Sequence, residues 1–143
     1  MSLKQQIQEN IKNALKQKES EKLSVLRLLM DSIIKKEKEL QKELEDQEIL
    51  KLVMSAVKRG QDAVEQFKQG GRNDLAEKEQ KEIDILKTYL PKQMDEQEIR
   101  LVVQKVIDSG ANNIGAVMKQ VMPEVQGKAD GKLVTDIVKE LLS

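Results

Sequence analysis

The sequence FKQGGRNDLA, residues 67–76, predicts a tight turn between two helices. Gly70 and Gly71 end the first helix, because glycine adopts the left-handed backbone conformation that closes helices. Asp74 and Glu77 form a D-x-x-E capping box, which opens a second helix by satisfying its free amide groups. Strong helix formers flank the turn on both sides. We therefore expect a helical hairpin centred on this stretch.

Both helices of this hairpin carry apolar stripes at helical spacing. The first helix begins with Asp46 as its cap, and the second stops at Pro91. Gly60 lies inside the first stripe. Because glycine costs about 1 kcal/mol in a helix interior, its place on the packed face indicates a close approach of another helix. The stripes consist of Ile49, Val53, Ala56, Gly60, Val64 and Phe67, and of Leu75, Ile83, Leu86 and Leu90.

Glu79 has an unusual position for an acidic residue, since it falls in the middle of the second apolar stripe. A buried carboxylate needs a partner. Arg59 and Arg72 supply the nearest guanidinium groups, and Arg72 is placed to reach Glu79 or a nearby carbonyl. We therefore favour a structural ion pair over a functional role for Glu79.

Two further helices precede the hairpin. The first has Ser2 as its cap, and the second starts near Ser20, with its first half expected to be the more deeply buried. Only Pro91 and Pro123 interrupt the chain, and runs typical of strands are absent, so the fold class is all-α. The first stripe is Leu3, Ile7, Ile11 and Leu15; the second is Leu23, Leu26, Met30, Ile33, Ile34 and Leu40, widened by Val25, Leu28 and Leu29.

The composition changes after Pro91. Residues 1–91 hold 18 basic and 17 acidic side chains, whereas residues 92–143 hold 7 and 8. We expect an N-terminal domain of about four helices over residues 1–91 and a three-helix C-terminal domain over residues 92–143.

Three helix starts and one helix end are predicted in the C-terminal domain. Asp95 with Glu98 forms a capping box for its first helix. Asn113 caps a short helix that stops before Pro123, and Asp130 caps the last helix.

The composition excludes several kinds of chemistry. The 143 residues include no Cys and no His, which removes thiol catalysis, Ser-His-Asp triads and the usual zinc sites. The net charge is zero, so no global field attracts DNA or an anionic membrane. No apolar run approaches the roughly 20 residues of a membrane span. We expect a cytoplasmic protein without metal, cofactor, DNA or membrane partner.

Two S-x-x-K motifs, residues 32–35 and 55–58, match the nucleophile motif of Ser-Lys acyl transferases. Neither has the S-D-N or K-T-G motif that completes such sites. Gly127-Lys128 lacks the upstream glycine and the following Ser or Thr of a phosphate-binding P-loop. We therefore predict no catalytic residue.

The segment Gly127-Lys128-Ala129-Asp130-Gly131-Lys132 leads into a helix N-terminus, where free amides and the helix dipole can hold a phosphate. Lys119, Lys128 and Lys132 could line this end of the domain as RNA contacts. Asp130 opposes phosphate binding with its own charge, and as a helix cap it would use the same amides. Both readings stay open.

Two signatures resemble the YqeY-like family, and the similarity covers essentially the whole chain. The central signature is residues 67–76, followed by Glu79, Glu82-Ile83 and Tyr89-Leu90-Pro91. The C-terminal signature comprises Met118, Met122-Pro123 and residues 127–134.

The YqeY-like family is similar to the tail region of the B subunit of glutamyl-tRNA(Gln)/aspartyl-tRNA(Asn) amidotransferase. This resemblance implies an all-helical fold of two parts. In the amidotransferase the tail contacts tRNA, while the amidase and kinase centres lie elsewhere. The resemblance thus implies a tRNA-associated binding module that is not itself catalytic.

Two alternatives remain. The family is often described as having carbon-nitrogen ligase activity with glutamine as amido-N-donor, so the chain could be an accessory component of a tRNA-amidation complex. Alternatively, it could be a protein-protein adaptor without RNA contact, which the neutral charge favours, because RNA-binding proteins usually show a basic face.

Overall fold

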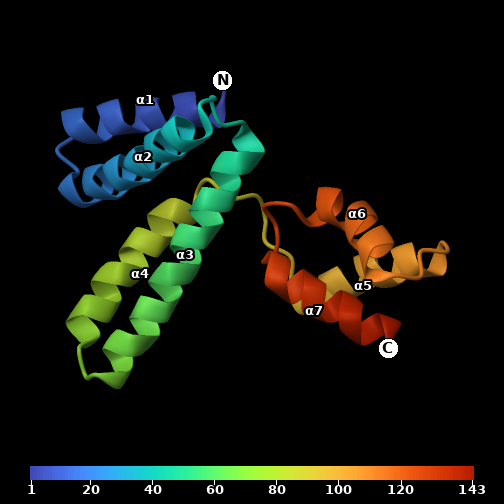
Figure 1. Cartoon of the computed structure of the whole chain (residues 1–143). Coiled ribbons are helices and arrows are strands. Elements are labelled where there is room, and N and C mark those ends of the chain that lie inside the picture. Colours follow the sequence, from blue (N-terminus) through green and yellow to red (C-terminus); the bar gives the residue numbers. More distant parts are fainter. The chain divides into compact units, whose positions relative to one another are not determined.

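The computed structural model describes all 143 residues. The chain forms seven α-helices joined by loops and no strand, which confirms the all-α fold class (Figure 1). No helix is both long and apolar enough to cross a membrane. The helices are α1 Leu3–Lys16, α2 Ser20–Leu40, α3 Asp46–Gln69, α4 Asn73–Lys87, α5 Glu96–Asp108, α6 Ile114–Val125 and α7 Gly131–Leu142.

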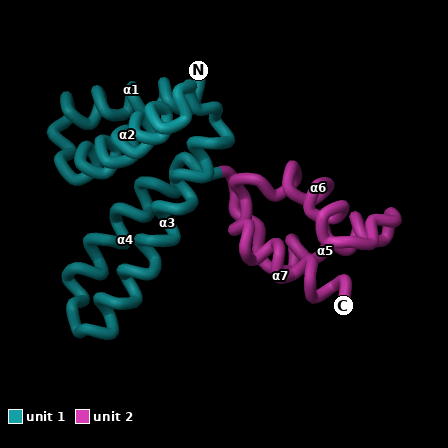
Figure 2. Tube along the Cα trace, viewed as in Figure 1, with its two compact units in different colours: residues 1–90 teal, residues 91–143 magenta.

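The chain divides into two compact units, each with its own apolar core (Figure 2). Unit 1, Met1–Leu90, contains α1 to α4, and unit 2, Pro91–Ser143, contains α5 to α7. In unit 1, α1 pairs with α2 and α3 pairs with α4 to form two helical hairpins (Figure 1). α2 also contacts both α3 and α4. The two hairpins therefore pack together largely through α2.

The apolar stripes of α1 and α2 form part of the unit 1 core, with corrections. Leu15 is 57% exposed and Ala14 is buried instead. Positions spaced by four residues drift about 40° around a helix at each step, so Leu15 has left the buried face. In α2 the first half is the more deeply buried, as predicted, but Leu28 is 66% exposed. Ile34 and Leu40 are also exposed.

The turn after α3 closes as the two glycines predict. Gly71 has φ +73°, the Gly71 amide donates to the Lys68 carbonyl at 3.1 Å, and the Arg72 amide donates to the Phe67 carbonyl at 2.8 Å. These two bonds are those of a Schellman motif. The predicted Asp74 cap is wrong, because α4 starts at Asn73 and Asp74 lies in its first turn. The chain re-enters helical geometry directly after the Schellman turn.

Gly60 confirms the predicted close approach. A Cβ atom at this position would lie 2.7 Å from Cγ1 of Ile83 and 3.2 Å from Oε1 of Glu79, both on α4. Ile83 is itself buried. The tight α3–α4 contact therefore requires a residue without a side chain at position 60.

Contacts between hairpins also fix α1. Ser2 caps α1 as predicted, accepting the Gln5 amide at 3.2 Å. Asp46, expected to cap α3, is instead its first residue, after the N-cap Glu45. Its carboxylate accepts the amide hydrogen of Leu3 at 2.9 Å, so the residue that starts α3 helps to cap α1.

The end of unit 1 differs from the predicted helix end at Pro91. α4 ends at Lys87, and the amides of the next three residues bond to carbonyls three positions earlier, in a tighter turn. This turn places the Tyr89 hydroxyl where it accepts a hydrogen bond from Asn10 Nδ2 of α1 at 2.7 Å. Burial raises the pKa of Tyr89.

In unit 2, three helices enclose a core that is mostly valine. The predicted caps are confirmed: Asp95 accepts the Glu98 amide at 2.8 Å, Asn113 the Ala116 amide at 2.8 Å, and Asp130 an amide of α7. The fully or almost fully buried residues are Ile99, Val103, Val117, Val121, Val125, Val134, Ile137 and Val138.

α6 does not stop before Pro123, as predicted, but continues to Val125. Pro123 has no amide hydrogen, so it cannot bond to the Lys119 carbonyl one turn earlier. The helix continues because Val125 is fully buried in the unit 2 core. It ends where Gly127 adopts φ +75°.

Candidate functional site

The loop between α6 and α7 is held by the segment that precedes α5. Gln93 Nε2 donates to the Gly127 carbonyl at 2.9 Å, and the Met94 amide donates to the Lys128 carbonyl at 2.9 Å. Gly127 itself is buried. The backbone next to the N-terminus of α7 is therefore tied to the start of unit 2.

The lysines predicted to contact RNA are all exposed, and none of them is in an ion pair with another residue of unit 2. Lys128 lies in the tied loop and Lys132 in the first turn of α7, so these two flank the same helix N-terminus. Lys119 lies on α6, six residues before that helix ends.

Unit 2 has one arginine, and its guanidinium already pairs with carboxylates of the same unit. Arg100 of α5 donates to Glu96 at 2.9 Å and to Glu140 of α7 at 2.8 Å. Arg100 thus links α5 to α7. The unpaired cations of this surface are therefore lysines.

Asp130 performs the capping role. Its Oδ1 accepts the Lys132 amide hydrogen at 3.2 Å, so this amide is already used within the chain. A phosphate at this end of α7 would meet the Lys128 and Lys132 side chains, but it would have to compete with the Asp130 carboxylate for the amides.

The predicted ion pair between Arg72 and Glu79 is wrong. Arg72 instead pairs with Asp74 at 3.2 Å on the exposed surface, and this bond lowers the pKa of Asp74. Arg59 makes no ion pair with Glu79 either. The Schellman turn places Arg72 at the far end of the hairpin, beside Asp74 and nearly two turns from Glu79. Glu79 therefore has no basic partner.

The neighbour of Glu79 is a second carboxyl group, Glu82, one turn further along α4. Both residues are half-buried. Burial, repulsion from the Glu79 carboxylate and a hydrogen bond between the two carboxyl groups raise the pKa of Glu82, and Lys78 offsets this only in part. Sequence reasoning found the odd position of Glu79 but not its acidic neighbour.

Replacing Glu82 with glutamine is expected to stabilise the protein at neutral pH by about 0.2–0.5 kcal/mol, the size of a like-charge pair one helical turn apart. The pKa of Glu82 is raised by folding, so its carboxyl group contributes most stability below the unfolded pKa and loses it as the pH rises through the folded pKa. The gain should vanish in acid. Thermal unfolding near neutral pH and in acidic buffer tests this, with exposed Glu77→Gln as control. A gain of equal size at both pH values would contradict it.

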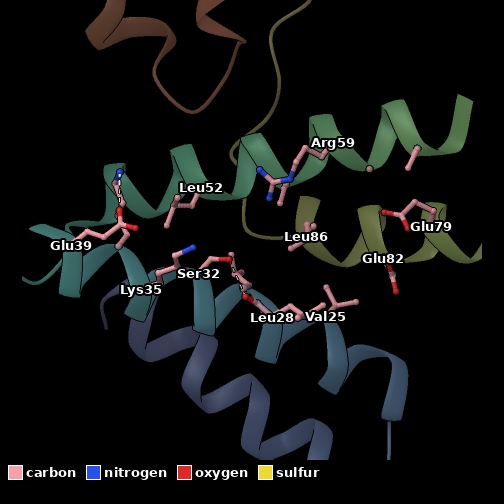
Figure 3. A pocket seen from close by; sticks show the side chains of 15 residues that line it. Val25, Leu28, Ser32, Lys35, Glu39, Leu52, Arg59, Glu79, Glu82 and Leu86 are labelled. Carbon is pink, nitrogen blue, oxygen red and sulfur yellow. Dashed lines mark hydrogen bonds and ion pairs between the residues drawn. The ribbon is translucent and has the colours of Figure 1, made fainter. Parts of the chain in front are cut away.

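A groove of about 570 Å³ lies in unit 1 between α2 and the α3–α4 hairpin (Figure 3). Its apolar lining includes exposed Leu28 together with Leu52 and Leu86. Lys35 and Glu39 line one end of it, and Glu79 and Glu82 line the other (Figure 3). The sequence alone does not predict this groove, because the apolar pattern of α2 does not show which of its positions remain uncovered.

The two S-x-x-K motifs do not form a catalytic arrangement. The Ser32 hydroxyl donates to the Leu28 carbonyl one turn earlier at 3.1 Å, which is the usual bond of an exposed helical serine. Ser55 is exposed on α3. Neither hydroxyl is hydrogen-bonded to a base that would activate it.

The chain is similar to a described protein family and to curated proteins that include the following two. A family model described as Yqey-like protein matches residues 4–142. Altered inheritance of mitochondria protein 41, mitochondrial, of Pyrenophora tritici-repentis is 29% identical over 143 residues, covering 95% of this chain and 78% of that protein. The protein of the same name from Lachancea thermotolerans is 28% identical over 123 residues, covering 85% of this chain and 63% of that protein. The matched range includes all of α5 to α7 and nearly all of unit 1.

Proposed function

We propose, since this chain belongs to the YqeY-like family, that it is a tRNA-associated binding module that is not itself catalytic. The observation that supports this is the tied loop at the N-terminus of α7, where Lys128 and Lys132 are exposed without a counterion from unit 2. Lys119 on α6 adds a third cation. The contact is with phosphate groups, because lysine side chains at a helix N-terminus recognise charge rather than base sequence.

The neutral charge of the chain sets the strength of this contact. Each neutralised phosphate contributes about 0.7–0.9 to the slope of log K against log salt, so three lysines give a slope of about −2 to −3. The protein therefore binds tRNA weakly on its own and needs a partner, such as a tRNA-aminoacylation or amidation complex, for tight binding.

The double substitution Lys128→Glu/Lys132→Glu is expected to reduce tRNA binding at low salt by at least about tenfold and to bring the salt slope to about −1. Fluorescence anisotropy with labelled tRNA measures both quantities, and circular dichroism checks that the helices are intact. Lys105→Glu/Lys139→Glu changes the net charge of unit 2 equally and should leave most binding.

Asp130→Asn provides a change in the opposite direction. Asparagine keeps the capping oxygen and removes the negative charge, so tRNA should bind more tightly. Equal binding of the Lys128→Glu/Lys132→Glu variant and the parent would show that the loop is only a helix cap.

We further propose the cytoplasm as the compartment, although the names of the two relatives place those proteins in mitochondria. Imaging of the tagged protein in its own cells tests this.

A protein-protein adaptor is the second candidate function. The groove in unit 1 favours it, because Leu28 is exposed in the lining of this groove.

A further inference from the structure

The groove in unit 1 has an apolar surface suited to protein contact. Leu28 is 66% exposed, and it lies among Leu52, Ala56 and Leu86 from the facing hairpin. Large exposed apolar side chains that line a concave surface between helices are typical of sites that bind an amphipathic helix.

Charged side chains are unevenly distributed along this apolar surface. Lys35 of α2 and Arg59 of α3 line the groove without an ion pair, and Lys36 has only a distant exposed contact with Glu39, at 3.8 Å. Figure 3 shows Lys35 and Glu39 at one end of the groove, Glu79 and Glu82 at the other end, and Arg59 between them. Neither Glu79 nor Glu82 has an ion-pair partner, and the neighbouring Glu79 carboxylate raises the pKa of Glu82.

We propose that this groove binds an amphipathic α-helix of a partner protein, whose apolar stripe covers Leu28 and whose ends carry opposite charges. Acidic side chains at one end of the partner helix pair with Lys35, and one further along pairs with Arg59, while basic side chains at the other end pair with Glu79 and Glu82. This interaction goes beyond the proposed tRNA contact, which involves unit 2 alone.

The same charges argue against a nucleic acid in the groove. A phosphate backbone that reached Lys35 and Arg59 would continue past Glu79 and Glu82, where like charges repel it. A helix with two oppositely charged ends satisfies both parts of the groove and also covers the apolar lining between them.

A fluorescently labelled helical peptide tests the proposal with the full-length chain. The peptide carries leucines at i, i+4 and i+7, glutamates at one end and lysines at the other, and a matched peptide has glutamine at every charged position. We expect the charged peptide to bind at least about tenfold more tightly than the neutral one, with the difference lost at high salt. Anisotropy measures both affinities.

Two variants separate the apolar and ionic contributions. Leu28→Glu should weaken both peptides by at least about tenfold, whereas Leu101→Glu, a control at an exposed leucine of unit 2, should change neither. Lys35→Glu/Arg59→Glu should remove the preference for the charged peptide. All four positions are exposed, so the fold should tolerate these changes.

Equal affinity for the two peptides, or unchanged binding by the Leu28→Glu variant, would overturn the proposal. Absence of binding by either peptide would do the same. Binding of labelled tRNA that is lost in the Lys35→Glu/Arg59→Glu variant would show instead that the groove holds nucleic acid. The lysine variants of unit 2 leave these peptide measurements unaffected, so this proposal and the tRNA proposal can fail separately.

Discussion

Gly60→Val is expected to destabilise unit 1 by about 3 kcal/mol, because it adds side-chain atoms where α3 and α4 already touch. Even the first added carbon would lie 2.7 Å from Cγ1 of Ile83, and that atom is next to the α4 backbone rather than at the end of a flexible chain. The helices can separate only by disturbing the core around Ile83. Chemical unfolding followed by circular dichroism measures the loss.

A glycine elsewhere provides the matched control for this prediction. Gly115 is also helical, but a Cβ atom there meets only Asn113 Oδ1 at 3.5 Å, so Gly115→Ala should stabilise by up to about 1 kcal/mol through helix propensity. The loss caused by Gly60→Val should shrink in an Ile83→Ala background, because that change removes the clashing atoms. A Gly60→Val variant as stable as the parent would show that the hairpin adjusts without cost.

Pro123→Ala is expected to stabilise unit 2 by about 1–2 kcal/mol. Proline costs about 3 kcal/mol relative to alanine inside a helix, and part of this is offset because proline also restricts the unfolded chain. Alanine restores an amide that can bond to the Lys119 carbonyl one turn earlier. Because position 123 is exposed, the new methyl group meets no core atom.

Hydrogen exchange of α6 and α7 amides measures this gain within unit 2 itself. Pro91→Ala is the control, since Pro91 lies outside any helix and its loss should give no comparable gain. Equal or faster exchange in the Pro123→Ala variant would mean that the proline is needed for the geometry of the loop before α7.

Much of the fold follows from local sequence signals. Helix caps and the Schellman turn use nearby backbone groups, so local sequence predicts them. The caps are Ser2, Asp95, Asn113 and Asp130, and the turn is at Gly70 and Gly71. Gly60 is predictable because a glycine within an apolar stripe has a cost that only close packing explains.

Two of the wrong predictions concern positions where distant groups compete. Asp46 was expected to cap its own helix, but its carboxylate bonds to the Leu3 amide, 43 residues away in sequence. Pro123 ends no helix, because burial of Val125 outweighs the lost hydrogen bond.

The candidate sites also combine features that local sequence predicts with features that it does not. The sequence placed Lys128 and Lys132 at a helix start, which is a local property, and the structure has them there. The sequence could not predict the groove in unit 1, because the lining of this groove comes from α2, α3 and α4 together. The partner predicted for Arg72 is wrong for a different, local reason, because the geometry of the Schellman turn places its guanidinium beside Asp74 rather than Glu79.

The hydrogen bond from Asn10 to Tyr89 gives the protein an internal spectroscopic reporter. The chain contains one tyrosine and no tryptophan, so its near-ultraviolet absorption and intrinsic emission come largely from a single ring. That ring is half-buried at the last turn of unit 1, in contact with α1. Detachment of α1 would expose the phenol to water and bring its alkaline titration back toward that of a free tyrosine. The docking of the first helix can thus be followed in the unmodified protein, without an added label.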